Sequence, residues 1–283
     1  MTPIATIPAS ALAPYRDLPS SDAPQREGLL IAEGAENVRW LLHSGLDVVS
    51  VLGKPTFGDA LAADVAARPI PPPFYAATPA EISAVVGYPF TRGVLACARR
   101  PQLPNLTELI ARWPVGPLRL VLMDGVHDHA NVGATIRNAR CFGLNAGILA
   151  GGCGDPWFRK TVRVSVGHVF HLPLSQHPDA AEAVRQLCEA GIHCLAAHRG
   201  PLSVSLRDLK EIPERWCLVL GNEDRGPLPA TLAACNSCLS IPMATGVDSL
   251  NVAAAGAVMM YGLSLPLSLP LSLPLSEVRG PKS

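Results

Sequence analysis

The chain has 283 residues, enough for two ordinary domains or for one domain with an extension. Hydrophobic residues make up 48% of it and charged residues only 16%, which argues against a disordered protein and indicates a well-filled core. The formal net charge is zero, so composition gives no support for a nucleic-acid partner, and any basic surface must be local.

The sequence predicts a cytoplasmic protein without a membrane span or a metal. The amino-terminal residues lack the basic segment and apolar core of a signal peptide, and no apolar run reaches the roughly 18–20 residues needed to span a bilayer. The eight cysteines lie in apolar contexts, as expected of buried thiols in a reduced cytosol. Cys235 and Cys238 have the spacing of half a zinc site or a redox pair, but no second pair follows at zinc-finger spacing.

The first 99 residues divide into an arm and a small α/β unit. Residues 1–25 are rich in proline, alanine and serine and are expected to form a flexible arm. Apolar runs and helical periodicity then alternate over residues 26–99, which predicts a small α/β domain. Its predicted elements are the strand Leu29–Ile31, a helix over Glu36–His43, the strand Asp47–Leu52, the extended stretch Phe74–Ala76, a helix that starts at Thr78–Glu81, and the strand Thr91–Ala98.

A proline-rich linker over residues 100–117 leads to a second unit over residues 118–263. Strands and helices alternate here too, which predicts an α/β fold with a mostly parallel sheet and helices on both faces. The predicted strands are Leu118–Met123, Leu144–Leu149, Val169–Leu174, His193–Ala197, Trp216–Leu220 and Cys238–Ile241. The predicted helices are Val132–Phe142, Asp179–Ala190, Leu228–Ala234 and Ser249–Leu263. Residues 264–283 are a low-complexity tail with a Leu-Ser-Leu-Pro repeat, to which we assign no chemistry.

A first motif lies in the first helix of the second unit. Asn131 occupies the expected N-cap, and Gly133 lets backbone or a ligand approach the first turn. Arg137 lies in an otherwise mostly apolar helix, so its guanidinium needs a carboxylate, a phosphate or the carbonyls of a neighbouring chain as a partner. A structural ion pair satisfies this need equally well, so the motif alone leaves the function open.

A second motif is the loop 221–226, which has glycine at both ends and charges between them. It follows a strongly apolar strand, at the carboxyl end, where open α/β sheets bind ligands. The glycine spacing superficially resembles a phosphate loop, but no Lys-Ser/Thr follows, and Glu223 and Asp224 would repel a phosphate. We therefore reject a nucleoside-triphosphate site.

A third motif joins Ile241-Pro242-Met243 to Ser249-Leu250-Asn251 at the start of the last helix. Ser249 can cap that helix, and Asn251 places an amide in its first turn. The small residues of 253–257 let the helix pack very closely against other backbone. A capped core helix explains Ser249, but it does not explain the loop before it.

In this order the three motifs closely resemble the signature motifs of the SpoU family, also called TrmH, in the SPOUT superfamily of methyltransferases. The family pattern is N-x-G-x-x-x-R, then L-G-x-E-x-x-G, then I-P-M followed by S-L-N-V, and it matches at 131–137, 220–226 and 241–252. The resemblance covers about residues 118–262 and extends more weakly to 32–34 and 92–96 in the first unit. The chain departs from the family at His129-Ala130, where a proline is frequent, and in its tail.

The resemblance implies a C-terminal trefoil knot that holds S-adenosylmethionine, and a homodimer with its site near the dimer interface. It implies methyl transfer to a ribose 2′-hydroxyl of RNA, and the small first domain, as a substrate-binding domain, favours ribosomal RNA over transfer RNA. The implied cofactor contacts are Gly221, Ile241 and Leu250, with Met243 and Ala197 as neighbours. The implied catalytic residues are Arg137, Glu223, Ser249, Asn251 and Asn131.

Each implied catalytic residue has an expected role. Arg137 contacts the hydroxyl as a base or as an electrostatic stabiliser, and Glu223 orients Arg137 or the loop. Ser249 and Asn251 position substrate or cofactor, and Asn131 shapes the substrate side of the pocket. Candidates to follow the RNA backbone are Arg99, Arg100, Arg159, Lys160 and Arg163, for which a solvated charged face is the alternative.

Two other classes of protein explain the sequence less well. A non-catalytic RNA-binding protein with the same fold is expected to have lost Arg137, Glu223 or Asn251, and all three are present. A Rossmann-type oxidoreductase needs a Gly-x-Gly-x-x-Gly turn after its first strand and an acidic residue about 20 positions on, and no such turn is found.

Overall fold

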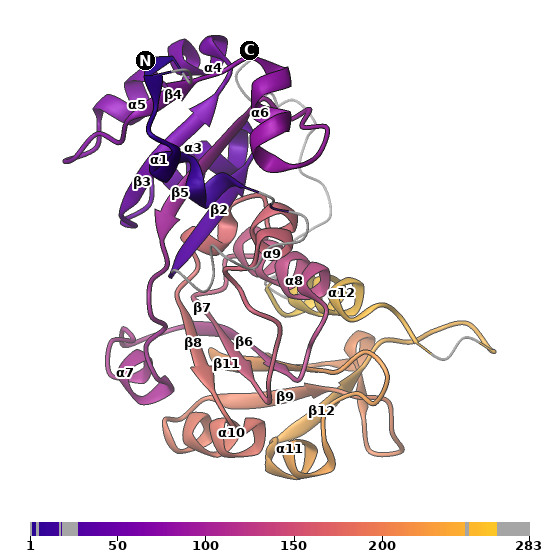
Figure 1. The fold of residues 1–283 in the computed structure, drawn as a ribbon. Helices are drawn as coiled ribbons and strands as arrows, with labels where there is room; N and C mark the ends of the chain where they lie inside the picture. The colour runs from indigo at the N-terminus through magenta and orange to yellow at the C-terminus, as the bar shows by residue number, and fades with distance from the viewer. Residues whose placement is uncertain (1, 4–5, 17, 19–27, 247–248, 265–283) are drawn as a thin grey trace, which may run out of the picture.

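The computed structural model describes all residues except 1, 4–5, 17, 19–27, 247–248 and 265–283. Two α/β units lie one above the other, each built on its own sheet (Figure 1). No helix in the described ranges is long and apolar enough to cross a membrane. Apart from Ser264, the Leu-Ser-Leu-Pro tail lies outside the described residues.

The first unit is a mixed five-stranded sheet in the order β1-β4-β3-β5-β2. Strand β5 runs antiparallel to its neighbours β2 and β3, while β4 pairs in parallel with β3 and β1. The strands are β1 Thr2–Pro3, β2 Leu29–Glu33, β3 Val48–Gly53, β4 Phe74–Ala76 and β5 Val94–Arg99. The helices are α1 Ala9–Leu12, η2 Ala13–Tyr15, α3 Ala35–Leu42, α4 Pro55–Ala60, α5 Ala62–Ala66 and α6 Pro79–Val86.

Part of the segment expected to be a flexible arm packs against this sheet. Leu12, Tyr15 and Leu18 are buried in a cluster with Ile82 of α6. The Tyr15 hydroxyl donates to the carbonyl oxygen of Ser50 at 2.9 Å, and its complete burial raises the pKa of Tyr15 well above its ordinary value. Three buried side chains are enough to anchor the segment. Its high proline and alanine content led to the expectation of a flexible arm.

The second unit is a seven-stranded sheet in the order β10-β12-β9-β11-β6-β7-β8, and every pair of its described strands is parallel. The strands are β6 Leu118–Asp124, β7 Ala146–Ala150, β8 Leu174–His177, β9 His193–Ala197, β10 Val204–Ser205, β11 Arg215–Gly221 and β12 Ser237–Ser240. The helices are α7 Leu106–Ile110, α8 His129–Cys141, α9 Arg159–Val164, η3 His168–Phe170, α10 Ala180–Glu189, η4 Leu206–Asp208, α11 Pro229–Ala234 and α12 Val252–Ser264. The mostly parallel sheet predicted from the sequence is confirmed.

The predicted strand Val169–Leu174 is wrong. Residues 168–170 form the 3-10 helix η3, and β8 begins only at Leu174. Val166 and Gly167 both have positive φ, at 52° and 77°, so the chain turns sharply before η3. Val169 and Leu172, which follow this turn, are buried. The sequence therefore has the apolar pattern of a strand although no strand forms there.

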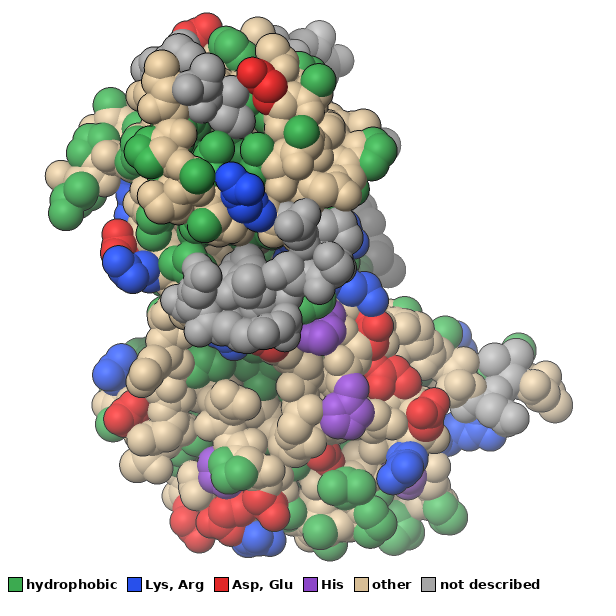
Figure 2. Space-filling view, in the orientation of Figure 1, with side chains coloured by type: hydrophobic (Ala, Val, Ile, Leu, Met, Phe, Trp, Pro, Cys, Tyr) green, Lys and Arg blue, Asp and Glu red, His purple; other side chains and the backbone are tan. Residues whose placement is uncertain are grey.

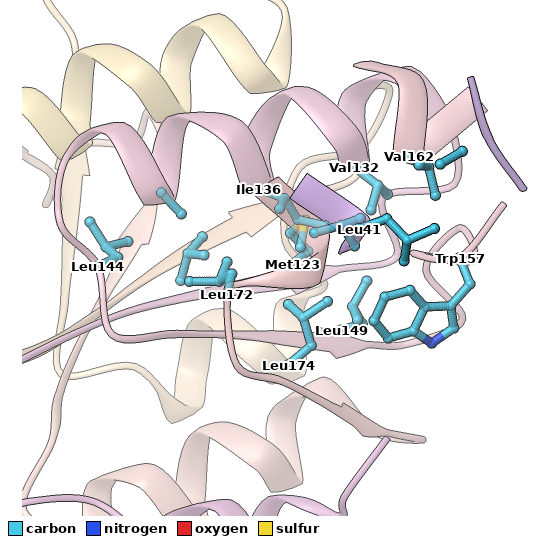
Figure 3. Close-up of a cluster of buried hydrophobic side chains, with 14 of the residues drawn as sticks. Leu41, Met123, Val132, Ile136, Leu144, Leu149, Trp157, Val162, Leu172 and Leu174 are labelled. Carbon is cyan, nitrogen blue, oxygen red and sulfur yellow. The ribbon is translucent and has the colours of Figure 1, made fainter. Parts of the chain in front are cut away.

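Helices cover both faces of the second sheet, with α8, α9 and α12 on one face and α10 and α11 on the other (Figure 1). Beneath α8, Val132 and Ile136 pack with Met123 and Leu149 of the sheet (Figure 3). Leu41 of the first unit belongs to the same buried cluster. This shared core fixes the first unit against α8 and α9, beside the carboxyl edge of the second sheet.

An ion pair also joins the two units. Glu33 is only 2% exposed, and its carboxylate accepts a hydrogen bond from Arg159 of α9 at 2.8 Å. Tyr88 donates to the same carboxylate oxygen at 3.1 Å, and burial together with Glu33 raises the pKa of Tyr88 to about 12. Arg159, a candidate for the RNA backbone, is therefore engaged inside the chain. On the face shown in Figure 2, Lys and Arg side chains are scattered among Asp and Glu.

Candidate active site

Residues of the three sequence motifs meet in one hydrogen-bonded network. The Asn251 side-chain amide donates to Asn131 Oδ1 at 2.9 Å, and the Asn131 amide donates to Glu223 Oε1 at 2.7 Å. Because one end of the Asn131 amide accepts and the other donates, its orientation is fixed. Segments about a hundred residues apart in the chain are thus joined at the carboxyl edge of the sheet.

The start of α8 differs from the prediction. The helix begins at His129, and its N-cap is Asp128, whose Oδ1 accepts from the backbone nitrogens of Ala130 and Asn131 at 2.6 and 3.1 Å. The prediction that Asn131 is the N-cap is therefore wrong. Lys160 donates to Asp128 at 2.9 Å, and this hydrogen bond lowers the pKa of Asp128. Because Asp128 caps the helix, the Asn131 side chain is available to the network.

The start of α12 also differs. Asn251 Oδ1 accepts from the backbone nitrogens of Ala253 and Ala254 at 3.0 and 3.2 Å, so Asn251 caps the helix and the prediction of a Ser249 cap is wrong. Asn251 thus uses its oxygen for the helix and its nitrogen for Asn131. Ser249 is exposed beside the network, and within the described structure its hydroxyl has no hydrogen-bond partner.

The glycine-bounded loop is held by Glu223 and Asn222. Asn222 donates to the Gly125 carbonyl at 2.9 Å and to Glu223 Oε2 at 3.3 Å. A Cβ placed on Gly221 would lie 1.8 Å from the backbone nitrogen of Pro227, so only glycine lets the loop fold back over the end of β11. Gly221 has this packing role, and its contact with a cofactor stays a prediction.

An apolar cavity lies beside the network, at the carboxyl ends of β9 and β12, and has a volume of about 110 Å³. Four of the five predicted cofactor residues line it, namely Ala197, Ile241, Met243 and Leu250. The other lining residues are His198, Arg199, Leu239, Ser240, Ala255 and Met259. Since Asn251 follows Leu250 directly, the apolar cavity and the network adjoin.

A second, polar hollow, which the sequence analysis missed, lies on the side of the loop that carries Glu223. It has a volume of about 240 Å³ and is lined by Asp124, Gly125, His127, Gly151, Asn222, Asp224, Arg225, Gly226 and Leu228. We call it the middle hollow, because it lies at the carboxyl ends of the central strands β6, β7 and β11. Asp124 is 2% exposed and accepts from the Leu228 backbone nitrogen at 3.0 Å. The sequence feature that could have indicated this hollow is the carboxylate of Asp124 at the end of an apolar strand.

Arg137 does not join the network within this chain. It lies six residues beyond Asn131, or about 240° around the helix after one full turn. The guanidinium is exposed, and the described residues give it no hydrogen bond or ion pair. Burial, then Arg140 and Arg137, lower the pKa of His168, so Arg137 lies toward η3. In this chain Glu223 holds Asn131 and the loop instead of Arg137.

Residues 118–261 match the model of the SpoU rRNA methylase family. An uncharacterized tRNA/rRNA methyltransferase of Mycobacterium bovis is 33% identical over 253 residues, which are 87% of this chain and 86% of that protein. This chain belongs to the SpoU rRNA methylase family. It is therefore an RNA methyltransferase that depends on S-adenosylmethionine.

Other SpoU relatives share parts of this sequence and fold. The 23S rRNA (guanosine(2553)-2′-O)-methyltransferase of Bacillus subtilis is 31% identical over 62% of this chain and 71% of its own length. A solved structure of an AdoMet-bound rRNA methyltransferase from Sinorhizobium meliloti has 25% identity and a TM-score of 0.74, and covers 93% of this chain and 96% of that chain. The high coverage means that the first unit of this SpoU protein also has a counterpart there.

Proposed function

We propose that this chain transfers the methyl group of S-adenosylmethionine to a ribose 2′-hydroxyl of structured RNA, with ribosomal RNA favoured over transfer RNA. The observation that carries the proposal is the network from Asn251 through Asn131 to Glu223, beside the apolar cavity. The name of the Bacillus subtilis relative, a 23S rRNA 2′-O-methyltransferase, supports both the ribose position and the class of RNA.

The apolar cavity is the proposed cofactor site. S-adenosylmethionine, when bound, supplies a methyl group on a positively charged sulfur. The walls from Ala197, Ile241, Met243 and Leu250 are apolar and suit its adenine ring. At about 110 Å³ the cavity is smaller than the roughly 300–1,000 Å³ of typical ligand sites. The cavity can therefore hold part of the cofactor, with the rest extending from its open side.

The network is proposed to orient the target ribose. A ribose hydroxyl is a weak acid, so the site has to hold it in line with the methyl group and stabilise charge as its proton leaves. Asn131 and Asn251 are already fixed by Glu223 and by the α12 cap, so little reorganisation is needed when RNA binds. We assign Glu223 to holding Asn131, and Ser249 to positioning substrate or cofactor. The middle hollow receives the target nucleotide.

Arg137 is proposed to contact the 2′-hydroxyl. A guanidinium keeps its proton at ordinary pH, which favours electrostatic stabilisation of the oxygen over a role as base. A base role needs help from a neighbouring RNA phosphate. Since Arg137 faces away from the Asn131 side of α8, we place its function in a homodimer, where a second copy supplies the guanidinium.

The homodimer is supported by the exposed face of α12. Val258 and Tyr261 are 43% and 48% exposed on this helix, and Leu250 beside it is 44% exposed. Large apolar side chains gathered on one face of a small-residue helix suit a close helix–helix contact. We also propose the family's C-terminal trefoil knot, which is supported by the return of α12 onto α8, where Asn138 donates to the Ala253 carbonyl at 2.9 Å.

We further propose that residues 26–99 bind the RNA substrate, that 100–117 link the units and that 118–263 carry out methyl transfer. The ion pair of Arg159 with Glu33 supports a fixed placement of the two units. An RNA substrate of this kind is compatible with a cytoplasmic enzyme.

Methyl transfer with nucleoside analysis tests the proposed function. The purified protein is incubated with tritiated S-adenosylmethionine and total RNA from a strain that lacks the gene, and the RNA is then digested with alkali. We expect label in alkali-resistant dinucleotides, which contain 2′-O-methyl ribose. Label on a base instead would reject the ribose position. An Arg137→Ala variant with wild-type rates and unchanged cofactor affinity would reject the role of Arg137.

A further inference from the structure

We propose that a third hollow, at the far end of the same sheet edge, binds a nucleobase of the RNA substrate. This edge hollow has a volume of about 550 Å³ and lies at the carboxyl ends of β7 and β8. Its polar lining includes Arg100, Gln102, Asp155, Trp157 and Gln176. The inference rests on the proposed function, because it concerns the RNA that the active site modifies.

The edge hollow is built by segments from both sides of the linker. Arg100 and Gln102 belong to the chain that leaves the first unit, while Gln176 lies on β8 of the second unit. A volume of about 550 Å³ falls within the roughly 300–1,000 Å³ of small-molecule sites and is ample for a base with its ribose. It is larger than the apolar cavity and the middle hollow together.

The wall contains a hydrogen-bond donor that lacks an acceptor. Trp157 is 6% exposed, and its indole Nε1 is buried with no partner in the described part of the chain. Figure 3 shows the indole nitrogen on the side of the ring away from Val132 and Val162. Because this nitrogen has almost no accessible surface, a ligand in the hollow does not reach it, and what Trp157 offers there is an aromatic ring against which an unpaired base can stack.

The charges of the edge hollow favour a neutral ligand. Arg100 donates to Asp155 at 2.6 Å, so its guanidinium is already compensated and offers little to a phosphate. The side-chain amides of Gln102 and Gln176 can both donate and accept hydrogen bonds. Within the described residues neither amide has a hydrogen-bond partner. Donors and acceptors side by side match the edge of a nucleobase, which is how proteins read unpaired RNA.

The one thiol in the hollow does not suggest a reaction there. Cys153 donates to the carbonyls of Met123 and Ala150 at 3.0 and 3.2 Å, and burial raises its pKa to about 11. The thiol therefore stays protonated near neutral pH and is a poor nucleophile. The edge hollow is accordingly a binding site and not a second catalytic site.

The position of the edge hollow matches a strand of RNA that also reaches the active site. The strand order β11-β6-β7-β8 puts three strand spacings, or roughly 15 Å, between the end of β11 that carries Glu223 and the end of β8. The middle hollow lies between them. A single strand laid along this edge would place its target nucleotide in the middle hollow, with the ribose toward the network, and a base a few nucleotides away in the edge hollow, which would give sequence selectivity.

The double variant Gln102→Ala/Gln176→Ala tests the inference in the full-length protein. Initial rates of tritiated-methyl transfer are measured against the concentration of total RNA from a strain that lacks the gene. We expect the half-saturating RNA concentration to rise about tenfold, as for the loss of a base contact, with the maximal rate and the affinity for S-adenosylmethionine within about twofold of wild type. Gln186→Ala, on α10, is the matched control and should change nothing.

A second variant fills the hollow. Gln176→Trp should raise the half-saturating RNA concentration at least as much, because its ring occupies the space of the base. Unchanged half-saturation in both variants, with an active wild type, overturns the edge hollow as a base site and leaves the proposed function standing. A wild type that transfers no methyl group to RNA overturns the proposed function itself, and this inference with it.

Discussion

At the scale of single residues, the candidate active site contains amide side chains that accept a hydrogen bond at one end and donate one at the other. Asn251 caps α12 with its oxygen and donates to Asn131 with its nitrogen, and Asn131 passes the interaction on to Glu223. Such a chain has one arrangement of donors and acceptors, so the side chains are held ready before substrate binds. The residues that form it were singled out in the sequence by their place in the three motifs that resemble those of the SpoU family.

The charge of Glu223 should matter for the rate more than for cofactor binding. Glu223→Gln keeps the size of the side chain but removes its charge and one acceptor. We expect methyl transfer to slow by about 100-fold, at the lower end of the losses on removing a preorganised polar group, with cofactor affinity within about twofold of wild type. Single-turnover rates and calorimetric cofactor titrations measure the two quantities. Glu189→Gln on α10 is the control, and equal rates for both variants would remove Glu223 from the site.

Gly221 should tolerate no side chain. The Cβ of Gly221→Ala would lie 1.8 Å from the Pro227 backbone nitrogen, so the loop must move. We expect the free energy of unfolding to fall by about 1–3 kcal/mol, as for overpacking, and methyl transfer to fall with it. Gly45→Ala is the matched control, because a Cβ there meets no atom within 4 Å. Urea denaturation of both variants checks the prediction, and equal stability would contradict it.

At the scale of elements, the sequence predicted which helices and strands exist better than where they begin. Residues 128–131 contain two good N-cap types, Asp128 and Asn131, and residues 249–251 contain two more, Ser249 and Asn251. Propensity does not choose between them. The tertiary contacts do, since Lys160 donates to Asp128 and Asn251 donates to Asn131 across the site. Both predicted helix starts were wrong by three residues for this reason.

The Asp128 cap should show a distinct pH dependence. Asp128→Ala should lower the free energy of unfolding by about 1 kcal/mol at pH 7, and Asp128→Asn by less, because Asn still caps. The Lys160 hydrogen bond lowers the pKa of Asp128, so the advantage of wild type over Asp128→Asn is present above the unfolded carboxyl pKa of about 3.9. This advantage is lost as the pH falls through the lower folded value. Urea titrations at pH 7 and pH 3 measure it, and an advantage that grows on acidification would contradict the assignment.

At the scale of the whole molecule, the placement of the two units could not be predicted from the sequence. The two α/β patterns and the linker were recognisable, but the contacts between units come from residues with no distinctive pattern. Trp40 of α3 lies 5.3 Å from His168 and 5.0 Å from His171 between ring centroids, and Glu33 pairs with Arg159. The polar hollows along the sheet edge were missed for the same reason, because their walls combine several distant segments.

Breaking the ion pair between the units should destabilise the protein. Arg159→Ala would leave the buried Glu33 carboxylate without its cation, a change that typically costs about 3 kcal/mol or more. Arg185→Ala removes a cation from an exposed pair with Glu182 and should cost less than about 1 kcal/mol. Equal losses in denaturant titrations of the two variants would show that Arg159 is an ordinary surface residue.

The proposed dimer should depend on α12. Val258→Glu places a charge on its exposed apolar face, and we expect a dimer in wild type and a monomer in the variant by analytical ultracentrifugation. Methyl transfer should be lost when the dimer is lost, because the proposal has Arg137 act in the dimer. Val115→Glu, at a fully exposed side chain of the linker, is the control. A wild-type monomer with full activity would refute both the dimer and the role given to Arg137.

The most direct measurement of the central claim is a crystal structure of the protein with S-adenosylmethionine or its product S-adenosylhomocysteine. We expect the adenine ring to lie in the cavity formed by Ala197, Ile241, Met243 and Leu250, with the sulfur on the side of Asn251. Cofactor bound in the edge hollow or elsewhere, with the apolar cavity empty, would contradict it.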